Sequence, residues 1–291
     1  MAKKVIGILN NIEEADDGGA NMGDHTILEV RNISIAFGGL QALTHASISI
    51  EAGEIYGLVG PNGAGKTVLL NCINGIYSPQ KGEIFFEGKD ITKMPRHKMV
   101  SLGISRTFQH IELFRDMTVI ENTLMGMHIY MKTGILSSGL FWGPGQREEE
   151  RGHQKAEEII DFLELYPYRK QKVGNLPFGI QKIVGLSRAL ASNPKLILMD
   201  EIFSGLNREE KEDLARFVLR IVYEKRITIV WVEHDMKLIT DLADRMACLN
   251  YGEIVAEGTP QEVTSNPLVI EAYIGSSSQS LMSQSLMSRH S

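Results

Sequence analysis

The stretch that decides the fold is Gly60-Pro61-Asn62-Gly63-Ala64-Gly65-Lys66-Thr67. Its spacing matches G-x-x-x-x-G-K-[ST], a pattern in which glycine backbone lets consecutive N–H groups turn inward around a phosphate. In this pattern Lys66 supplies a cation for the β- and γ-phosphates, and the Thr67 hydroxyl ligates Mg²⁺. The alternative is an ordinary glycine-rich turn, but such a turn does not require a lysine and a threonine directly after its last glycine. We therefore predict that the chain binds a nucleoside triphosphate.

The segments on either side of this loop have the periodicity that the loop requires. Residues 55–59 are apolar and predict a buried strand, and residues 67–73 have helical spacing, so the helix would point its N-terminus at the phosphates. Strand-like patterns also cover residues 27–37, 43–50 and 82–88. The sequence thus predicts a strand-rich N-terminal region around the phosphate loop.

Downstream, two short apolar runs at residues 196–199 and 227–232 flank an amphipathic helix over residues 208–224. One face of this helix carries Leu214, Phe217, Val218, Ile221 and Val222. Asn207, followed three residues later by Glu210, predicts a capping box at the helix start. A strand, a helix and another strand in this order imply a mostly parallel sheet, so the predicted fold class is α/β.

Composition limits the other possibilities. The net charge of −6 and the isoelectric point near 5.8 argue against a general nucleic-acid-binding protein. Cys72 and Cys248 both lie in apolar segments, which predicts buried thiols rather than a disulfide. No apolar run approaches the roughly 20 residues of a membrane span, and the N-terminus has no apolar signal core. We therefore expect a cytoplasmic protein.

The chain of 291 residues has three expected parts. Residues 1–26 are rich in Asn, Asp, Glu and Gly and predict a loose arm, with Met22 as an alternative start. Residues 27–275 form the main domain, in which residues of about 110–190 read as a helical insertion between two halves of the nucleotide-binding core. Helical spacing covers residues 119–130 and 148–165 there, and residues 133–145 predict a loop between them. Residues 276–291 contain a Ser-Leu-Met-Ser repetition and predict a disordered tail.

Polar residues at the ends of the predicted strands supply candidate chemistry. Asp200 and Glu201 end the apolar run at 196–199, where Asp200 would bind Mg²⁺ through water and Glu201 would orient and polarise the attacking water. His234 ends the next strand and is expected at the same edge of the sheet. Gln109 follows another short apolar segment and would reach the γ-phosphate and Mg²⁺ as a neutral amide. Read alone, each of these residues is equally well an ordinary surface residue.

A second glycine-containing motif precedes a predicted helix and consists of Leu176, Pro177, Phe178, Gly179, Ile180 and Gln181. Gly179 at a helix entry would present backbone N–H groups to an anion. Taken by itself, this motif is a weak indication of function.

Together these motifs resemble the ATP-binding subunits of ABC transporters over about residues 27–275. The matching motifs, in chain order, are Walker A (Gly60 to Thr67), the Q-loop (Gln109), the signature (Leu176 to Gln181), Walker B (Leu196 to Glu201), the D-loop (Ser204 to Asn207) and the switch histidine (His234). Phe37 falls where this family stacks an aromatic ring on adenine, although it also reads as a strand core residue. The branched-chain amino acid importer group is the most similar, as in Arg106-Thr107-Phe108-Gln109 and Glu271-Ala272-Tyr273-Ile274-Gly275.

This resemblance implies a P-loop NTPase fold, with a RecA-like parallel core sheet, an N-terminal antiparallel β subdomain and an inserted α-helical subdomain. It implies ATP and Mg²⁺ as cofactors, and a homodimer or a heterodimer with a related subunit. In that dimer each ATP lies between one subunit's Walker A and the other's signature, with Phe37 and Asn207 among the nucleotide contacts. Partners would be two transmembrane permease subunits and, indirectly, a solute-binding protein, on the cytoplasmic side of the inner membrane. No nucleic acid is expected.

Three positions depart from the family pattern. Val68 replaces a hydroxyl residue that normally touches the α-phosphate, Ile180 replaces a polar signature residue, and Ile202 replaces the usual proline after the Walker B glutamate. Each lost hydrogen bond to a charged group would cost about 1.5–3 kcal/mol. We therefore expect weaker nucleotide binding or slower turnover than in an ideal family member, with hydrolysis retained.

Two other functions remain open at this level. One is the ATPase of another ABC system, such as a lipopolysaccharide-type exporter. The other is a non-transport ABC ATPase that acts on DNA or ribosomes, or a regulatory ATP-binding module. Long coiled-coil insertions or a tandem second cassette would favour the non-transport class, and the sequence has neither.

Overall fold

The computed structural model describes residues 25–107, 113–127 and 144–274, with no side-chain description for residues 144–149. These residues belong to two compact units, one formed by residues 97–227 and the other by residues 25–96 with 228–274. The predicted N-terminal arm, apart from its last two residues, and the predicted tail lie outside the described residues, as does Gln109.

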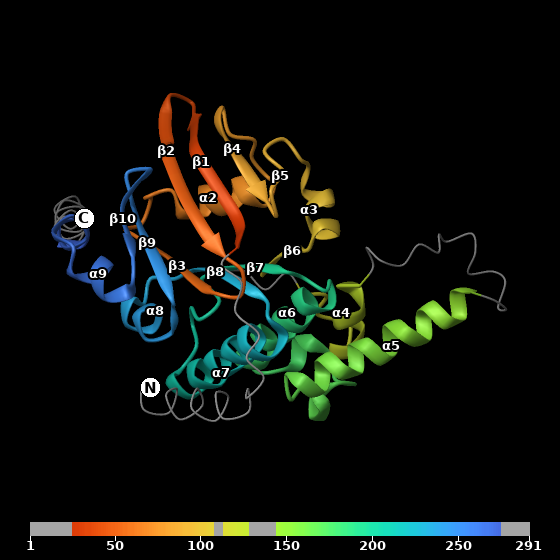
Figure 1. Cartoon of the computed structure of the whole chain (residues 1–291). Coiled ribbons are helices and arrows are strands. Elements are labelled where there is room, and N and C mark those ends of the chain that lie inside the picture. The colour runs from red at the N-terminus through yellow and green to blue at the C-terminus, as the bar shows by residue number, and fades with distance from the viewer. Residues whose placement is uncertain (1–24, 108–112, 128–143, 275–291) are drawn as a thin grey trace, which may run out of the picture. The chain divides into compact units, whose positions relative to one another are not determined.

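An antiparallel sheet forms the N-terminal part of the second unit (Figure 1). Its order is β2-β1-β4-β5, with bounds β1 (Thr26–Phe37), β2 (Leu40–Glu51), β4 (Lys81–Phe86) and β5 (Lys89–Asp90). Alternate positions at the end of β2 face the core, namely Ala46, Ile48 and Ile50. The predicted antiparallel β subdomain is confirmed, and β2 begins three residues earlier than the sequence pattern indicated.

Parallel strands of the same unit carry the phosphate loop. Strand β3 (Ile55–Val59) is fully buried and pairs in parallel with β8 (Thr228–Val232) and with β9 (Arg245–Asn250). Strand β10 (Glu253–Gly258) pairs with β9 in the antiparallel sense. Burial of β3 on both faces explains why its sequence is apolar throughout rather than alternating.

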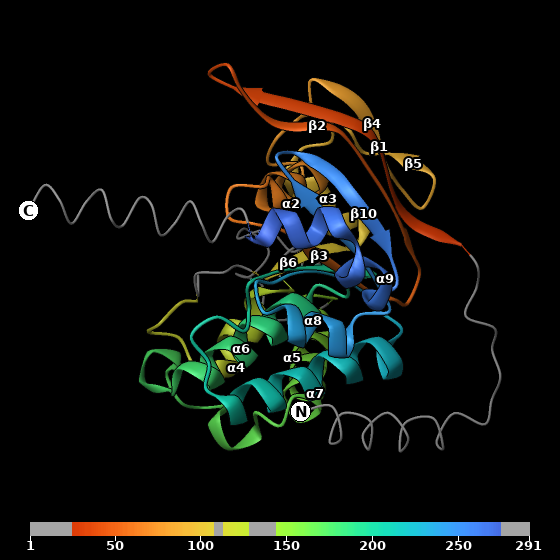
Figure 2. The same cartoon turned by 90° about the vertical axis from the view of Figure 1, so that its left-hand side faces the viewer.

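Helices cover these strands. Helix α2 (Lys66–Ile73) follows β3, while α8 (Met236–Leu242), α9 (Pro260–Ser265) and a helical segment at residues 267–274 lie in the C-terminal part (Figure 2). Helix α8 approaches β3 so closely that a Cβ at Gly57 would lie 2.7 Å from Ile239 Cγ2. A glycine in the middle of this strand is therefore a packing requirement.

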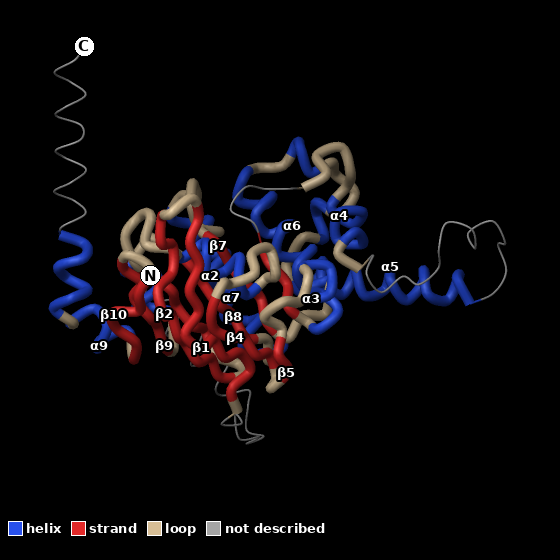
Figure 3. Tube along the Cα trace, turned by 90° about the horizontal axis from the view of Figure 1, so that it is seen from above, coloured by secondary structure: helices blue, strands red, loops and turns tan. Residues whose placement is uncertain are grey.

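The other unit contains a parallel strand pair, β6 (Ile104–Thr107) and β7 (Leu196–Asp200), and most of the helices. The helical elements are α3 (Arg96–Leu102), which starts at the boundary between the units, α4 (Val119–Met125), α5 (Pro144–Phe162), η1 (Tyr166–Tyr168), η2 (Val173–Asn175), α6 (Phe178–Ala191) and α7 (Arg208–Lys225). Helices α4, α5 and α6 pack around Met127, Ala156 and Ala191 (Figure 3). Among helices of the described residues, none has the length together with the hydropathy of a membrane-spanning segment.

Three sequence-based boundaries are wrong. The helix expected over residues 119–130 ends at Met125, and residues 128–130 lie outside the described residues. Pro144 and Gly145, expected in a loop, open α5; a proline is tolerated in the first helical turn because its missing N–H has no helical partner there. Helix α6 starts at Phe178, so residues 179–181 lie inside its first turn instead of before it.

Candidate functional site

The phosphate loop connects β3 to α2, and its glycines have backbone angles that other residues rarely adopt. Gly60, Gly63 and Gly65 have φ values of 145°, 78° and 106°. A Cβ at Gly60 would lie 2.0 Å from the Leu249 carbonyl oxygen, and one at Gly65 would lie 2.6 Å from the Ala42 carbonyl oxygen. The loop therefore requires glycine for both conformation and space, and this geometry fits a cradle of backbone N–H groups around phosphate.

Helix α2 begins immediately after this loop. Its N-cap residue is Gly65, and no side chain of the described residues caps the first N–H groups of the helix. Such a helix start suits an anion, because it presents backbone donors together with the positive end of the helix dipole. Asn62, Gly63 and Thr67 are exposed around it.

The Lys66 ammonium lies within the loop itself. Its Nζ donates to the carbonyl oxygens of Gly60 at 2.7 Å and Pro61 at 2.9 Å, and the residue is buried. Cys248 is buried nearby, and although the Lys66 charge opposes the shift, burial raises the pKa of its thiol to about 11; burial also raises that of Cys72 to about 12. Both cysteines are free and buried, so the prediction of buried thiols rather than a disulfide is confirmed.

Phe37 and His234 belong to the same unit as the phosphate loop. Phe37 is 44% exposed, with its ring edge-on to Tyr77 at 5.0 Å between centroids, so the interpretation of Phe37 as a strand core residue is wrong. His234 is exposed and follows β8, whose Val232 pairs with Leu58 just before the loop. The carboxyl ends of β3 and β8 therefore meet at one sheet edge, where His234 lies.

Asp200 lies in the other unit as the last residue of β7. Its Oδ2 accepts a hydrogen bond from Arg106 Nη2 at 2.7 Å, and the two side chains are only 5% and 6% exposed. Asp200 Oδ1 is buried and has no hydrogen-bond partner among the described residues. Sequence reasoning did not identify Arg106 as a site residue, although a charged residue inside the apolar segment 104–108 is a signal that it faces a buried opposite charge.

The oxygen donors present fit Mg²⁺. Each unit carries an oxygen donor of the hard type that this ion takes, directly or through water: the buried Asp200 carboxylate in one unit and the exposed Thr67 in the other. Glu201 follows Asp200 with a φ of 50°, a left-handed conformation uncommon outside glycine that is often found at functional positions. Gln109, the third expected metal ligand, lies outside the described residues.

The signature motif forms the start of α6. Pro177 is the N-cap without a side-chain cap, and it and Phe178 are exposed, while Gly179 is buried. Glu210 packs against Gly179, where a Cβ would lie 2.6 Å from the carboxylate oxygen Oε1. The same glutamate closes the capping box of α7 with Asn207, accepting from the Asn207 N–H at 2.9 Å.

Glu210 therefore connects the signature motif with the start of α7, which directly follows the D-loop residues 204–207. Gln181, expected to contact nucleotide, is buried and donates from Nε2 to the Leu176 carbonyl oxygen at 2.8 Å. Ile180 and Val68 are half-buried, and Ile202 is buried, so these departures from the family pattern put apolar atoms into packed surroundings.

Comparisons with known proteins agree with this geometry. A family model described as ABC transporter matches residues 43–204, and one described as branched-chain amino acid ATP-binding cassette transporter matches residues 253–278. The high-affinity branched-chain amino acid transport ATP-binding protein BraF of Pseudomonas aeruginosa is 36% identical over 250 residues, which cover 86% of this chain and 98% of that protein. LivG of Escherichia coli is 35% identical over 249 residues, covering 86% and 98%.

Solved structures give the same result. A nucleotide-free ATP-binding cassette from an ABC transporter matches with a TM-score of 0.75 at 36% identity, covering 86% of this chain and 99% of that one. An ADP conformation of an ATP-binding cassette matches with a TM-score of 0.76 at 36% identity and the same coverage.

Proposed function

Because this chain belongs to the family of ABC transporter ATP-binding subunits, and is an ATPase of that family, we propose that it drives the uptake of branched-chain or other hydrophobic amino acids. The C-terminal match to the branched-chain group and the names of its relatives support this solute class. The proposed ATP-binding domain is residues 27–275, with the helical subdomain at about 110–190, the arm at 1–26 and the tail at 276–291.

The single observation that carries the nucleotide site is the loop geometry. Positive-φ glycines precede a helix start without a side-chain cap, with Lys66 beside them. On nucleotide binding the Lys66 ammonium exchanges the carbonyl oxygens of Gly60 and Pro61 for phosphate oxygens. Phe37, already exposed, is the proposed stacking partner of adenine.

Glu201 is the proposed residue that polarises the attacking water, and the other proposed catalytic residues are His234, Lys66 and Gln109. Thr67, Asp200 and Gln109 are the proposed Mg²⁺ ligands. When bound, Mg²⁺ neutralises phosphate charge that develops during transfer.

The exposed start of α6 supports the proposed assembly. In a dimer of two copies, or with a related subunit, residues 176–181 of one copy are proposed to cover the ATP held by the phosphate loop of the other. Pro177 and Phe178 are exposed and able to make such a contact. Two transmembrane permeases would bind the dimer at the cytoplasmic membrane face, and a solute-binding protein would deliver the amino acid to them.

The catalytic assignment is tested by phosphate release at saturating Mg-ATP from wild type and Glu201→Gln. We expect a loss of at least about a hundredfold, since general-base contributions are typically 10²–10⁴-fold. Glu209→Gln is the matched control, because Glu209 is an exposed carboxylate in the first turn of α7 and should leave the rate unchanged. Equal rates for Glu201→Gln and wild type would remove Glu201 from the mechanism.

The solute class is tested separately in proteoliposomes that contain the cognate permeases. An importer predicts that a liganded solute-binding protein stimulates ATP hydrolysis when leucine, isoleucine or valine is present. Stimulation by lipopolysaccharide precursors instead would favour the exporter, and hydrolysis that is indifferent to permeases would favour a non-transport ATPase.

A further inference from the structure

The C-terminal part of the chain contacts the phosphate loop at two residues. The Gly60 N–H donates to the Tyr273 hydroxyl oxygen at 2.9 Å, and the Gly252 N–H donates to the Ala64 carbonyl oxygen at 2.9 Å. Tyr273 lies in the helical segment 267–274, and Gly252 lies in the turn between β9 and β10. All of these residues belong to the same compact unit.

Gly60, the first residue of the loop, is held from three directions. Its N–H is bound by Tyr273, its carbonyl oxygen accepts from Lys66 at 2.7 Å, and its Cα lies against the Leu249 carbonyl group, where a Cβ would approach to 2.0 Å. A phosphate loop binds its ligand with backbone N–H groups. Here the Gly60 N–H is directed to the tyrosine, so the first residue of the loop is fixed by protein.

The Tyr273 hydroxyl is itself positioned by its helical segment. The Asn266 side-chain oxygen accepts from the Leu268 N–H at 2.9 Å at the start of this segment, and Val269, 2% exposed, anchors it in the core. Burial, more than the neighbouring Cys248 thiol, raises the pKa of Tyr273 to about 12. The hydroxyl is therefore protonated at physiological pH, and its oxygen accepts the hydrogen bond from Gly60.

We propose that Tyr273 is a positioning residue for nucleotide binding, which holds Gly60 so that the following N–H groups of the loop stay aligned for phosphate. This inference rests on the proposed nucleotide site at the phosphate loop. Because linkage is reciprocal, an ordered loop that favours nucleotide also means that bound nucleotide stabilises the helical segment 267–274. The helical segment 267–274 thus stabilises the phosphate loop through the hydrogen bond between Tyr273 and Gly60.

Tyr273→Phe tests this, because it removes only the hydroxyl group. The equilibrium dissociation constant for ADP in Mg²⁺ buffer, measured on the full chain by calorimetry, should rise about three- to tenfold, the effect of one neutral hydrogen bond. Tyr166→Phe is the matched control: Tyr166 is 57% exposed, and its contact with Arg169 through the ring face survives the change. Its ADP affinity should equal that of wild type.

Hydrogen exchange distinguishes a role in nucleotide binding from a purely structural role of Tyr273. In wild type, ADP should slow amide exchange across residues 267–274, and in Tyr273→Phe this protection should be lost while the nucleotide-free variant keeps its thermal midpoint. Equal ADP affinity in wild type and Tyr273→Phe would overturn the proposal. Tighter binding by the variant would also overturn it, because the hydroxyl would then compete with phosphate for the Gly60 N–H. Failure of wild type to bind ADP would instead overturn the proposed function.

Discussion

At the scale of single residues, the ion pair between Asp200 and Arg106 is almost completely buried. Asp200 and Arg106 are 5% and 6% exposed and lie on neighbouring parallel strands, with 2.7 Å between Oδ2 and Nη2. Burying either charge alone is strongly unfavourable, so each residue depends on the other. Exposed pairs differ, since Arg208 and Glu212 on α7 interact where the arginine is 80% exposed.

Arg106→Met should therefore lower the free energy of unfolding by about 3–5 kcal/mol, because Asp200 would remain buried without its countercharge. The measurement is urea denaturation with EDTA present, so that no divalent cation substitutes for the guanidinium. Arg208→Met is the matched control and should cost about 0.5 kcal/mol or less, as exposed i,i+4 pairs do. A loss no greater than that of the control would show that the buried pair contributes nothing net.

At the scale of helices and strands, caps and close contacts decide where each element begins and how it packs. Capping boxes start α4, α7 and α9, with Thr118, Asn207 and Thr259 as the N-cap residues. The C-cap residue of α4 is Gly126, which lies against the backbone of α6: a Cβ there would lie 2.2 Å from the Arg188 carbonyl oxygen. By contrast, a Cβ at Gly185 within α6 would meet nothing within 4 Å.

The two glycines should respond to alanine in opposite directions. Gly126→Ala forces α4 and α6 apart and should destabilise the fold by about 1–3 kcal/mol, the usual cost of overpacking. Gly185→Ala should stabilise it by about 0.5–1 kcal/mol, because alanine is the better helix former and has room. Thermal or chemical denaturation of both variants measures this contrast, and a shift of the same sign in both would contradict the close contact.

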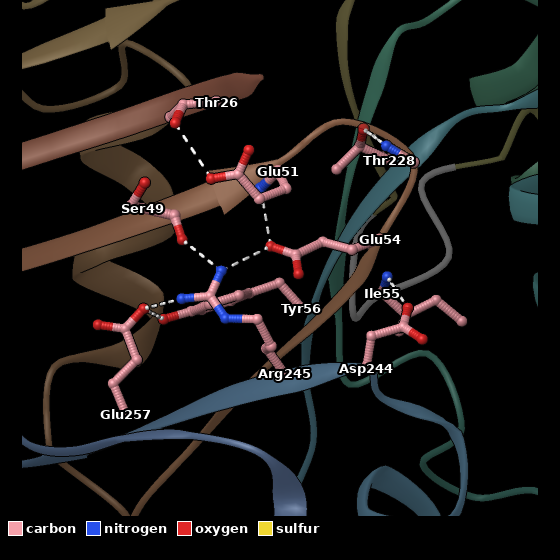
Figure 4. A network of polar contacts seen from close by, with 11 residues as sticks. Thr26, Ser49, Glu51, Glu54, Ile55, Tyr56, Thr228, Asp244, Arg245 and Glu257 are labelled. Carbon is pink, nitrogen blue, oxygen red and sulfur yellow. Dashed lines mark hydrogen bonds and ion pairs between the residues drawn. The ribbon is translucent and has the colours of Figure 1, made fainter. Parts of the chain in front are cut away.

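At the scale of the whole molecule, stability depends on polar groups that connect strands of different sheets (Figure 4). Arg245 on β9 donates to the Ser49 carbonyl oxygen on β2 and contacts Glu54 and Glu257 at 3.2 and 3.0 Å. The Tyr56 hydroxyl donates to Glu257 at 2.7 Å. Burial raises the pKa of the Glu54 carboxyl to about 7, against the opposing effects of its hydrogen bond from Glu51 N–H and the charge of Arg245.

This raised pKa predicts a pH dependence of stability. The folded state holds the Glu54 proton up to about pH 7, whereas the unfolded chain releases it near 4.5, so the folded state binds more protons between these values. Stability therefore falls as the pH rises through this range. Between pH 5.5 and 8 wild type should lose about 2 kcal/mol more than Glu54→Gln, which cannot titrate. Urea denaturation at the two pH values measures the difference, and parallel pH profiles for the two proteins would refute it.

Local patterns predicted most elements near the site. Strand β3, helix α2 and helix α7 with its Asn207 capping box all lie where their periodicity placed them, because backbone preference, burial and caps agree there. Local patterns did not predict where α6 starts, because Pro177, Phe178 and Gly179 have no side chain that caps a helix. At this position Glu210 of α7 packs against Gly179, which is a tertiary contact.

The sequence by itself determined the chemistry of the family. The loop from Gly60 to Thr67 contains, within eight adjacent positions, the glycine, lysine and threonine that phosphate binding requires. Only the tertiary structure decided that Arg106 neutralises Asp200, 94 residues away, and that Tyr273 binds the N–H of Gly60, 213 residues away. A hydrogen bond between distant residues leaves no periodicity in the chain, because it depends on strand register and helix placement rather than on local backbone preference.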